Sequence, residues 1–96
     1  MEIKPLHTKV EKTIQIMHGT IVLENPEGFP RSDCNLYCIS SEGAIVWKAE
    51  KPDPSTLYSR VKLNENGATI STYTLSSHAC ELDLVTGKIL SKTGIQ

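Results

Sequence analysis

Apolar and polar residues alternate along most of residues 35–92, and three short turn sequences interrupt the alternation. A period of two is typical of a strand with one buried face, and glycine-containing turns between such runs favour β-hairpins. The turns are Ser41-Glu42-Gly43, Asn66-Gly67 and Val85-Thr86-Gly87. The pattern therefore predicts three consecutive hairpins, over residues 35–48, 58–75 and 79–90.

The first of these hairpins has apolar residues on both faces. Its turn predicts the facing pairs Ile39 with Ile45, Tyr37 with Trp47 and, on the reverse side, Cys38 with Val46. Strands that are apolar on both faces are typical of a sheet centre that is covered on two sides. Tyr37 and Trp47 can bury more area than any other pair, so we expect them to anchor the core together. The functional alternative is an exposed Trp47 that serves as a ligand platform.

The hairpin around Asn66-Gly67 has one apolar and one polar face. Asn-Gly is the strongest short hairpin signal in the chain, and it predicts the pairs Leu63 with Ile70 and Val61 with Thr72. The opposite face carries Arg60, Lys62, Ser71 and Tyr73, and we expect this face to be exposed to solvent.

The two ends of the chain are less regular. In the last hairpin Leu82 should meet Ile89 or Leu90, and residues 92–96 should fray. Residues 12–24 predict one more hairpin around His18-Gly19, with the pairs Met17 with Thr20, Ile16 with Ile21 and Ile14 with Leu23. Residues 1–11 predict an extended lead-in or edge strand. Two proline-containing loops, residues 25–32 and 50–56, separate the hairpins.

These elements predict one all-β domain over residues 1–96, an antiparallel meander of about seven or eight short strands. No stretch keeps the apolar spacing of a helix. The loop at 50–56 divides the chain into two halves, residues 12–50 and 57–92. Open edge strands are an aggregation hazard, so we expect barrel-like or sandwich-like closure, or closure by self-association.

The chain also matches itself at an offset of about 43–44 residues, a period in the range of propeller blades. Residues 36–40 fall on 79–83, and residues 42–46 fall on 86–90. Here the sequence resembles the repeats of quinoprotein-like β-propellers, which bind pyrroloquinoline quinone (PQQ). Their motif has an Asp, a Gly four residues later, usually preceded by Thr, and a Trp four residues beyond that Gly. Asp83, Thr86 and Gly87 match in the second half, with Ser91 in place of the Trp.

Gly43 and Trp47 match the same motif in the first half, with Ile39 at the Asp position, or Ser40 if a residue is deleted. The resemblance implies two degenerate four-stranded blades and concerns architecture only. The family's quinone site needs a full ring of blades and an adjacent cysteine pair, whereas Cys34 and Cys38 are not adjacent. We therefore expect no cofactor.

Charge and composition narrow the class of protein. The net charge is −1 with both signs mixed along the chain, so nucleic acid is not an expected partner. No apolar run approaches the ~20 residues of a membrane span, and the N-terminus lacks the layout of a signal peptide. We therefore expect a cytoplasmic protein without a membrane partner. An odd number of cysteines, three, favours reduced, buried thiols over disulfides.

Two groups of residues are candidate sites. Arg60, Lys62 and Tyr73, with Tyr58 nearby, form a mixture of cationic and aromatic groups that partner surfaces favour. This surface indicates a non-enzymatic module that binds a protein partner or assembles with itself as a homo-oligomer. The alternative is a metal or small-ligand site on the side that carries Cys34, Cys38, His78 and Cys80. A small enzyme with a Cys/His site is the third hypothesis, since no catalytic motif is present.

Overall fold

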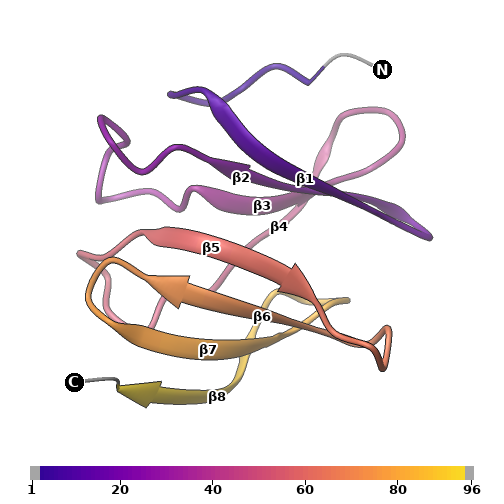
Figure 1. The fold of residues 1–96 in the computed structure, drawn as a ribbon. Helices are drawn as coiled ribbons and strands as arrows, with labels where there is room; N and C mark the ends of the chain where they lie inside the picture. Colours follow the sequence, from indigo (N-terminus) through magenta and orange to yellow (C-terminus); the bar gives the residue numbers. More distant parts are fainter. Residues whose placement is uncertain (1–2, 95–96) are drawn as a thin grey trace.

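A computed structural model describes residues 3–94, which form eight strands in two four-stranded antiparallel sheets (Figure 1). The first sheet contains β1 (Val10–Ile16), β2 (Gly19–Glu24), β3 (Leu36–Ile39) and β4 (Ile45–Lys48). The second contains β5 (Tyr58–Leu63), β6 (Thr69–Thr74), β7 (His78–Asp83) and β8 (Ile89–Gly94). Each strand pairs with the next along the chain. The predicted all-β meander is confirmed, and neither sheet closes into a barrel among the described residues.

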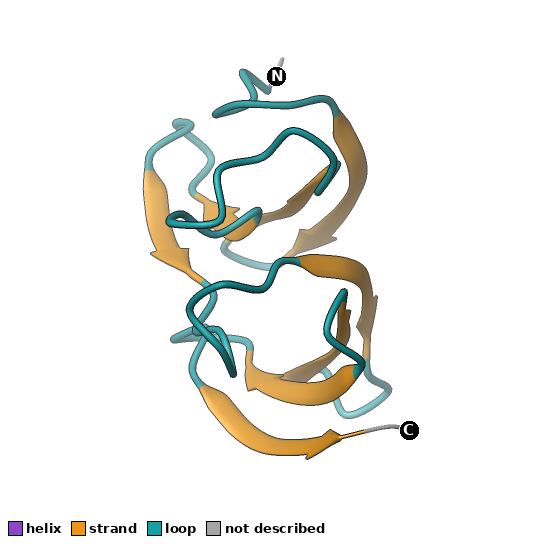
Figure 2. Cartoon of the chain, turned by 90° about the vertical axis from the view of Figure 1, so that its left-hand side faces the viewer, coloured by secondary structure: helices purple, strands orange, loops and turns teal. Residues whose placement is uncertain are grey.

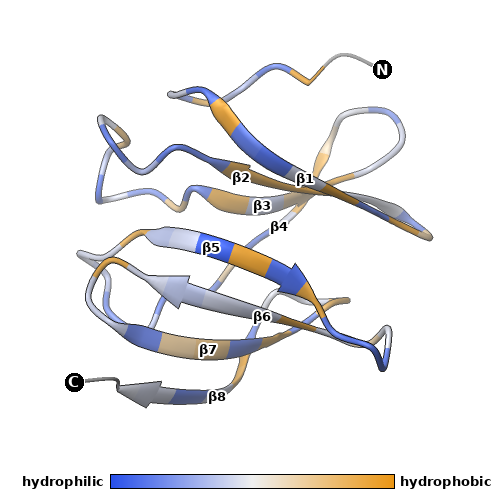
Figure 3. Cartoon of the chain, in the orientation of Figure 1, coloured by the Kyte–Doolittle hydropathy of each residue, from blue (hydrophilic) through white to orange (hydrophobic). Residues whose placement is uncertain are grey.

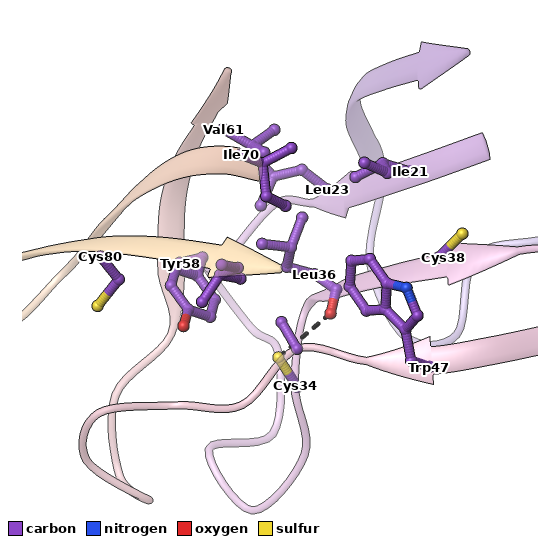
Figure 4. Packing of buried hydrophobic residues seen from close by; sticks show 12 residues of the cluster. Ile21, Leu23, Cys34, Leu36, Cys38, Trp47, Tyr58, Val61, Ile70 and Cys80 are labelled. Carbon is purple, nitrogen blue, oxygen red and sulfur yellow. Dashed lines mark hydrogen bonds between the residues drawn. The ribbon is translucent and has the colours of Figure 1, made fainter. Parts of the chain in front are cut away.

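The two sheets lie one over the other and share an apolar core (Figures 2 and 4). Twelve buried residues form this core: Ile21, Leu23, Cys34, Leu36, Cys38, Trp47, Ala49, Tyr58, Val61, Ile70, Cys80 and Leu82. A smaller cluster of Val22, Tyr37 and Ile39 lies on the other face of the first sheet, where Ile3, Leu6 and Val10 cover it. Strands β2 and β3 are therefore buried on both faces. Figure 3 shows this contrast between hydrophobic β2 and β3 and hydrophilic β8.

The side chain of Asn35 joins the two sheets. Its Nδ2 donates to the carbonyl oxygens of Glu24 (2.8 Å) and Tyr58 (2.7 Å), and its Oδ1 accepts from the backbone N–H of Tyr58 (2.9 Å). Asn35 is fully buried. A buried amide must have its donors and acceptors paired, and these three bonds achieve that while they hold the end of β2 beside the start of β5.

Trp47 provides a second link between the sheets. Its Nε1 donates to the carbonyl oxygen of Leu84 at 3.1 Å, and its ring lies against Gly87 in the turn between β7 and β8. Next to it, the backbone N–H of Glu50 donates to Gly87 O at 2.9 Å, and Glu50 Oε1 accepts from the backbone N–H of Ile89 at 2.8 Å. Trp47 is only 8% exposed, so the predicted burial is confirmed.

Several predicted pairs are confirmed, and pairs in two hairpins are wrong. Leu63 faces Ile70, Val61 faces Thr72, Leu82 faces Ile89 and Ile39 faces Ile45. The predicted pairs of Tyr37 with Trp47 and of Cys38 with Val46 are wrong, because a register shift at Val46 places Trp47 opposite Cys38 and Lys48 opposite Tyr37. Tyr37 and Trp47 consequently lie in different clusters, on opposite faces of the sheet. The hairpin is also not central throughout, since β4 is an exposed edge strand.

The first hairpin turns at Met17-His18 instead of His18-Gly19. Ile14 therefore faces Ile21, and Ile16 faces Gly19. Gly19 is the first residue of β2, and glycine is required there because a Cβ would overlap the carbonyl oxygen of Ile39 on the neighbouring strand. The shift is two residues, so Ile14 and Ile16 still lie on the face that packs against the shared core.

The C-terminal end of the chain differs from the prediction. Strand β8 continues to Gly94, so residues 92–94 are paired and do not fray. At the N-terminal end, residues 3–9 form no strand and lead into the edge strand β1, which begins at Val10. The remaining positions of both predictions, residues 1–2 and 95–96, lie outside the described residues.

The two sheets follow one design. Register shifts occur at matching points, in the first hairpin (Val10/Lys12 and Tyr58/Arg60) and in the last (Cys38/Ile39 and Glu81/Leu82). Superposing these registers places Tyr73 at the position of Leu23, and Ser91 at the position of Trp47. The face of the first sheet that packs on the second sheet is thus apolar, whereas the matching face of the second sheet is polar.

The contact between Trp47 and Gly87 predicts unequal effects of alanine at two turn glycines. Gly87 and Gly67 both have a positive φ (73° and 68°), so each substitution should cost about 1–2 kcal/mol of stability. An alanine Cβ at Gly87 would also lie 2.6 Å from Trp47 Cδ2, whereas nothing lies within 4 Å at Gly67. Gly87→Ala should therefore lose about 1–3 kcal/mol more than Gly67→Ala. Urea unfolding followed by Trp47 fluorescence measures both, and equal losses would contradict this packing.

Candidate functional site

The structure brings three of the four predicted partner-binding residues together on the outer face of the second sheet. Arg60 is opposite Tyr73, and Lys62 is opposite Ser71. Arg60 and Lys62 are exposed and Tyr73 is half-buried. The alternation of β5 and β6 alone is enough to produce this arrangement, because positions two apart on a strand share a face.

Tyr58 does not belong to this surface, so that prediction is wrong. It is fully buried in the shared core, and its hydroxyl donates to the carbonyl oxygen of Glu50. The register shift between Tyr58 and Arg60 leaves Ser59 as an extra residue. A bulge of this kind breaks the alternation of side chains, and Tyr58 therefore points inward while Arg60 points outward.

A groove of about 450 Å³, here called the basic groove, runs beside this face. It is lined by Glu11, Lys12, Leu23, Ser59, Arg60, Val61, Lys62, Ser71, Thr72 and Tyr73. Strand β1 contributes Lys12, whose Nζ donates to the carbonyl oxygen of Val61 at 2.9 Å. This bond covers a backbone oxygen at the free edge of β5, a common way to protect an edge strand. Three of the lining residues are cationic and only Glu11 is anionic.

The cysteine and histidine side chains do not form a common site. Cys34, Cys38 and Cys80 are all buried, and Figure 4 shows their sulfur atoms in different parts of the core. His78 instead contacts Ser76, with Nδ1 and Oγ 3.0 Å apart. Within residues 3–94, no three His, Cys, Asp or Glu side chains lie close enough to hold a metal ion.

The three thiols are also poorly suited to nucleophilic chemistry. Burial raises the pKa of Cys34, Cys38 and Cys80 above the usual thiol value. A thiol is reactive as the thiolate, and reactive cysteines lie in partly exposed, electropositive surroundings that lower the pKa. These side chains act as small apolar residues of the core.

A second hollow, here called the apolar cleft, was not predicted from the sequence. Its volume is about 360 Å³, and it is lined by Ile16, Met17, His18, Cys38, Val46, Trp47, Gly67, Leu84 and Val85. Three of these apolar residues are largely exposed: Met17 (91%), Val85 (77%) and Val46 (55%). The only signal in the sequence is that Met17 and Val85 are large apolar residues at turns, where polar residues are usual.

A buried carboxylate holds the segment that precedes β1. Glu24 accepts hydrogen bonds from the backbone N–H groups of Leu6 (2.6 Å), His7 (3.0 Å) and Thr8 (2.9 Å), and from the hydroxyl of Tyr37. Burial raises the pKa of Glu24, but these four donors lower it more, so the pKa lies below its usual 4.5. Through these bonds Glu24 holds residues 3–9 over the outer cluster of the first sheet. No sequence pattern predicted this role.

The described residues thus form an all-β domain of two stacked sheets with a basic groove and an apolar cleft on its surface. In this part of the chain no helix is long and apolar enough to cross a membrane. A family model described as "Domain of unknown function (DUF7957)" matches residues 3–94, and the chain belongs to this family. Comparisons with curated proteins and with solved structures gave no match. The resemblance to quinoprotein-like propeller blades stays a prediction.

The network around Glu24 predicts a pH-dependent stability. Because the pKa of Glu24 is lowered on folding, its contribution is complete above about pH 4.5 and is lost as the pH falls through the folded-state pKa. Glu24→Gln should cost about 2–3 kcal/mol at pH 7, since one carboxylate oxygen is replaced by a donor that faces other donors. Urea unfolding should show this difference shrinking below pH 4.5.

Glu65→Gln is the matched control, because Glu65 is exposed and should change stability little at any pH. Hydrogen exchange of the amides of Leu6, His7 and Thr8 should speed up in Glu24→Gln and stay unchanged in Glu65→Gln. A loss of stability in Glu24→Gln that is equally large at pH 7 and at pH 3 would contradict the role assigned to the carboxylate.

Proposed function

We propose that this domain is a non-enzymatic protein-binding module, and that its basic groove takes an acidic segment of a partner protein. The observation that carries this proposal is the gathering of Lys12, Arg60 and Lys62 around one groove that contains a single carboxylate, Glu11. The chain as a whole has a net charge of −1. The positive charge of the groove is therefore local and does not reflect an overall basic protein.

The lack of ion pairs at Arg60 and Lys62 within the described residues supports the proposal. Within residues 3–94 the ion pairs are His7 with Asp33 and Lys48 with Asp33, so Arg60 and Lys62 are free to meet charges on a partner. Tyr73, opposite Arg60 on the neighbouring strand, adds an aromatic surface of low conformational entropy, and Arg and Tyr are enriched where proteins bind proteins. Complementary charge of this kind speeds association and selects the partner.

The groove also offers hydroxyl groups for hydrogen bonds with a peptide. Ser59 Oγ donates to the carbonyl oxygen of Tyr73 at 3.1 Å, and Ser71 Oγ donates to Asn64 Oδ1 at 2.8 Å. Both hydroxyl oxygens keep lone pairs that can accept from a bound backbone N–H. The groove therefore combines cations for acidic side chains with acceptors for the peptide backbone.

Selection of peptides from a random library against the immobilised domain tests this proposal. The enriched peptides should be rich in Asp and Glu, and their affinity should fall with added salt. Arg60→Glu and Lys62→Glu should each weaken binding about tenfold or more, which corresponds to roughly 1.4 kcal/mol. Titration calorimetry with one selected peptide measures this change.

Lys88→Glu is the control, because Lys88 is exposed and makes the same change of charge outside the groove. It should leave the affinity within about twofold of the native domain. Enrichment of peptides without acidic residues, or an equal loss of affinity in Lys88→Glu, would overturn the proposal.

A further inference from the structure

The apolar cleft lies at the end of the molecule where three turns come together. It is bordered by the β1–β2 turn, the β5–β6 turn, the β7–β8 turn and the beginning of β4. These turns are on the right of Figure 1. The cleft shares no residue with the basic groove, so the inference drawn from it does not depend on the proposed function.

Apolar side chains that elsewhere would be buried are exposed around this cleft. Met17, Val85 and Val46 stand at its border, and Trp47 and Leu84 belong to its lining. Val46 carries this apolar surface onto the edge strand β4. A contiguous apolar surface of this kind marks an interaction site in a water-exposed protein.

We propose that the apolar cleft is a homodimer interface, in which Met17 of each copy enters the cleft of the other copy. An isologous interface requires a patch that is complementary to itself, so a projection and a hollow must lie side by side on the same surface. Met17 is 91% exposed and borders the hollow directly. Its unbranched, flexible side chain suits insertion into an irregular apolar space.

Charge favours a second copy over a charged partner at this site. No Asp, Glu, Lys or Arg lines the cleft, and His18 is the one basic residue among its lining residues. Two copies therefore bring no fixed like charges together here. Two basic grooves, by contrast, would face each other with like charge, which disfavours an isologous contact at that face.

The size of the surface sets the expected strength. A stable interface buries about 800 Å² on each partner, which is roughly one seventh of the 5772 Å² surface of this domain. The cleft and Met17 reach this area only if most of that end of the molecule is covered. A reversible dimer with a dissociation constant in the range of about 1–100 µM is therefore expected.

Sedimentation equilibrium of the full chain, from about 1 µM to about 1 mM, tests the dimer. The weight-average mass should rise with concentration toward twice the 10.6 kDa of one chain. Met17→Glu and Val85→Glu should each weaken dimerisation at least tenfold, because two carboxylates would be buried in an apolar contact. Thermal unfolding of both variants should match the native chain at low concentration, since both side chains are exposed.

Leu75→Glu is the matched control, because Leu75 is a 47% exposed apolar residue outside the cleft. It should dimerise like the native chain. Lys62→Glu should also dimerise normally while it loses acidic peptides, so failure of the dimer and failure of the proposed function are distinguishable.

Three results would overturn the dimer. The first is a native chain that stays monomeric at about 1 mM. The second is an equal loss of dimerisation in Leu75→Glu. The third is fluorescence of the dye ANS bound at the cleft that does not fall per chain as the concentration rises to about 1 mM, because the cleft would then stay open for a different partner.

Discussion

The line of contact between the two sheets, here called the seam, is the constraint on which the rest of the structure depends. Asn35 makes the hydrogen bonds that the end of β2 and the start of β5 cannot make with each other, because they belong to different sheets. Left unpaired in an apolar core, each of these backbone groups would cost about 1–3 kcal/mol. Trp47 closes the same seam from β4, against Leu84 and Gly87. With the seam in place, β1 lies close enough to β5 for Lys12 to reach Val61 and complete the basic groove.

The two sheets repeat one design, and the outer face of each differs from the apolar faces that meet in the shared core. Glu24 holds residues 3–9 over the outer face of the first sheet. On the second sheet, the face that would pack on a further sheet carries Lys62, Ser71 and Tyr73 in place of apolar residues. Covering or polarising the outer faces is how stacked repeats end their array. The surfaces proposed for partners are the basic groove, which this polar face lines, and the apolar cleft at the turns.

Most hairpins were predictable because their signals are local. Asn66-Gly67 set the register of β5 and β6, and the alternation along these strands placed Arg60, Lys62 and Tyr73 on one face. Two of the errors arose where a single residue was added to a strand. Extra residues at Val46 and Ser59 turned Trp47 away from Tyr37 and moved Tyr58 into the core. A bulge changes the free energy of its own strand little, and whether it forms depends on how both faces of the sheet pack. It therefore leaves no reliable pattern in the sequence.

Strand composition, turn residues and the spacing between them were sufficient for the all-β class, the meander order and a number of about seven or eight strands, since each depends on neighbours along the chain. The relation between the two sheets depended on contacts between residues far apart in the sequence, such as Asn35 with Tyr58 and Trp47 with Leu84. The groove and the cleft exist only where segments of both sheets meet. A pattern within one strand carries no information on which other strand will lie across from it, and for this reason both surfaces became visible only in the folded chain.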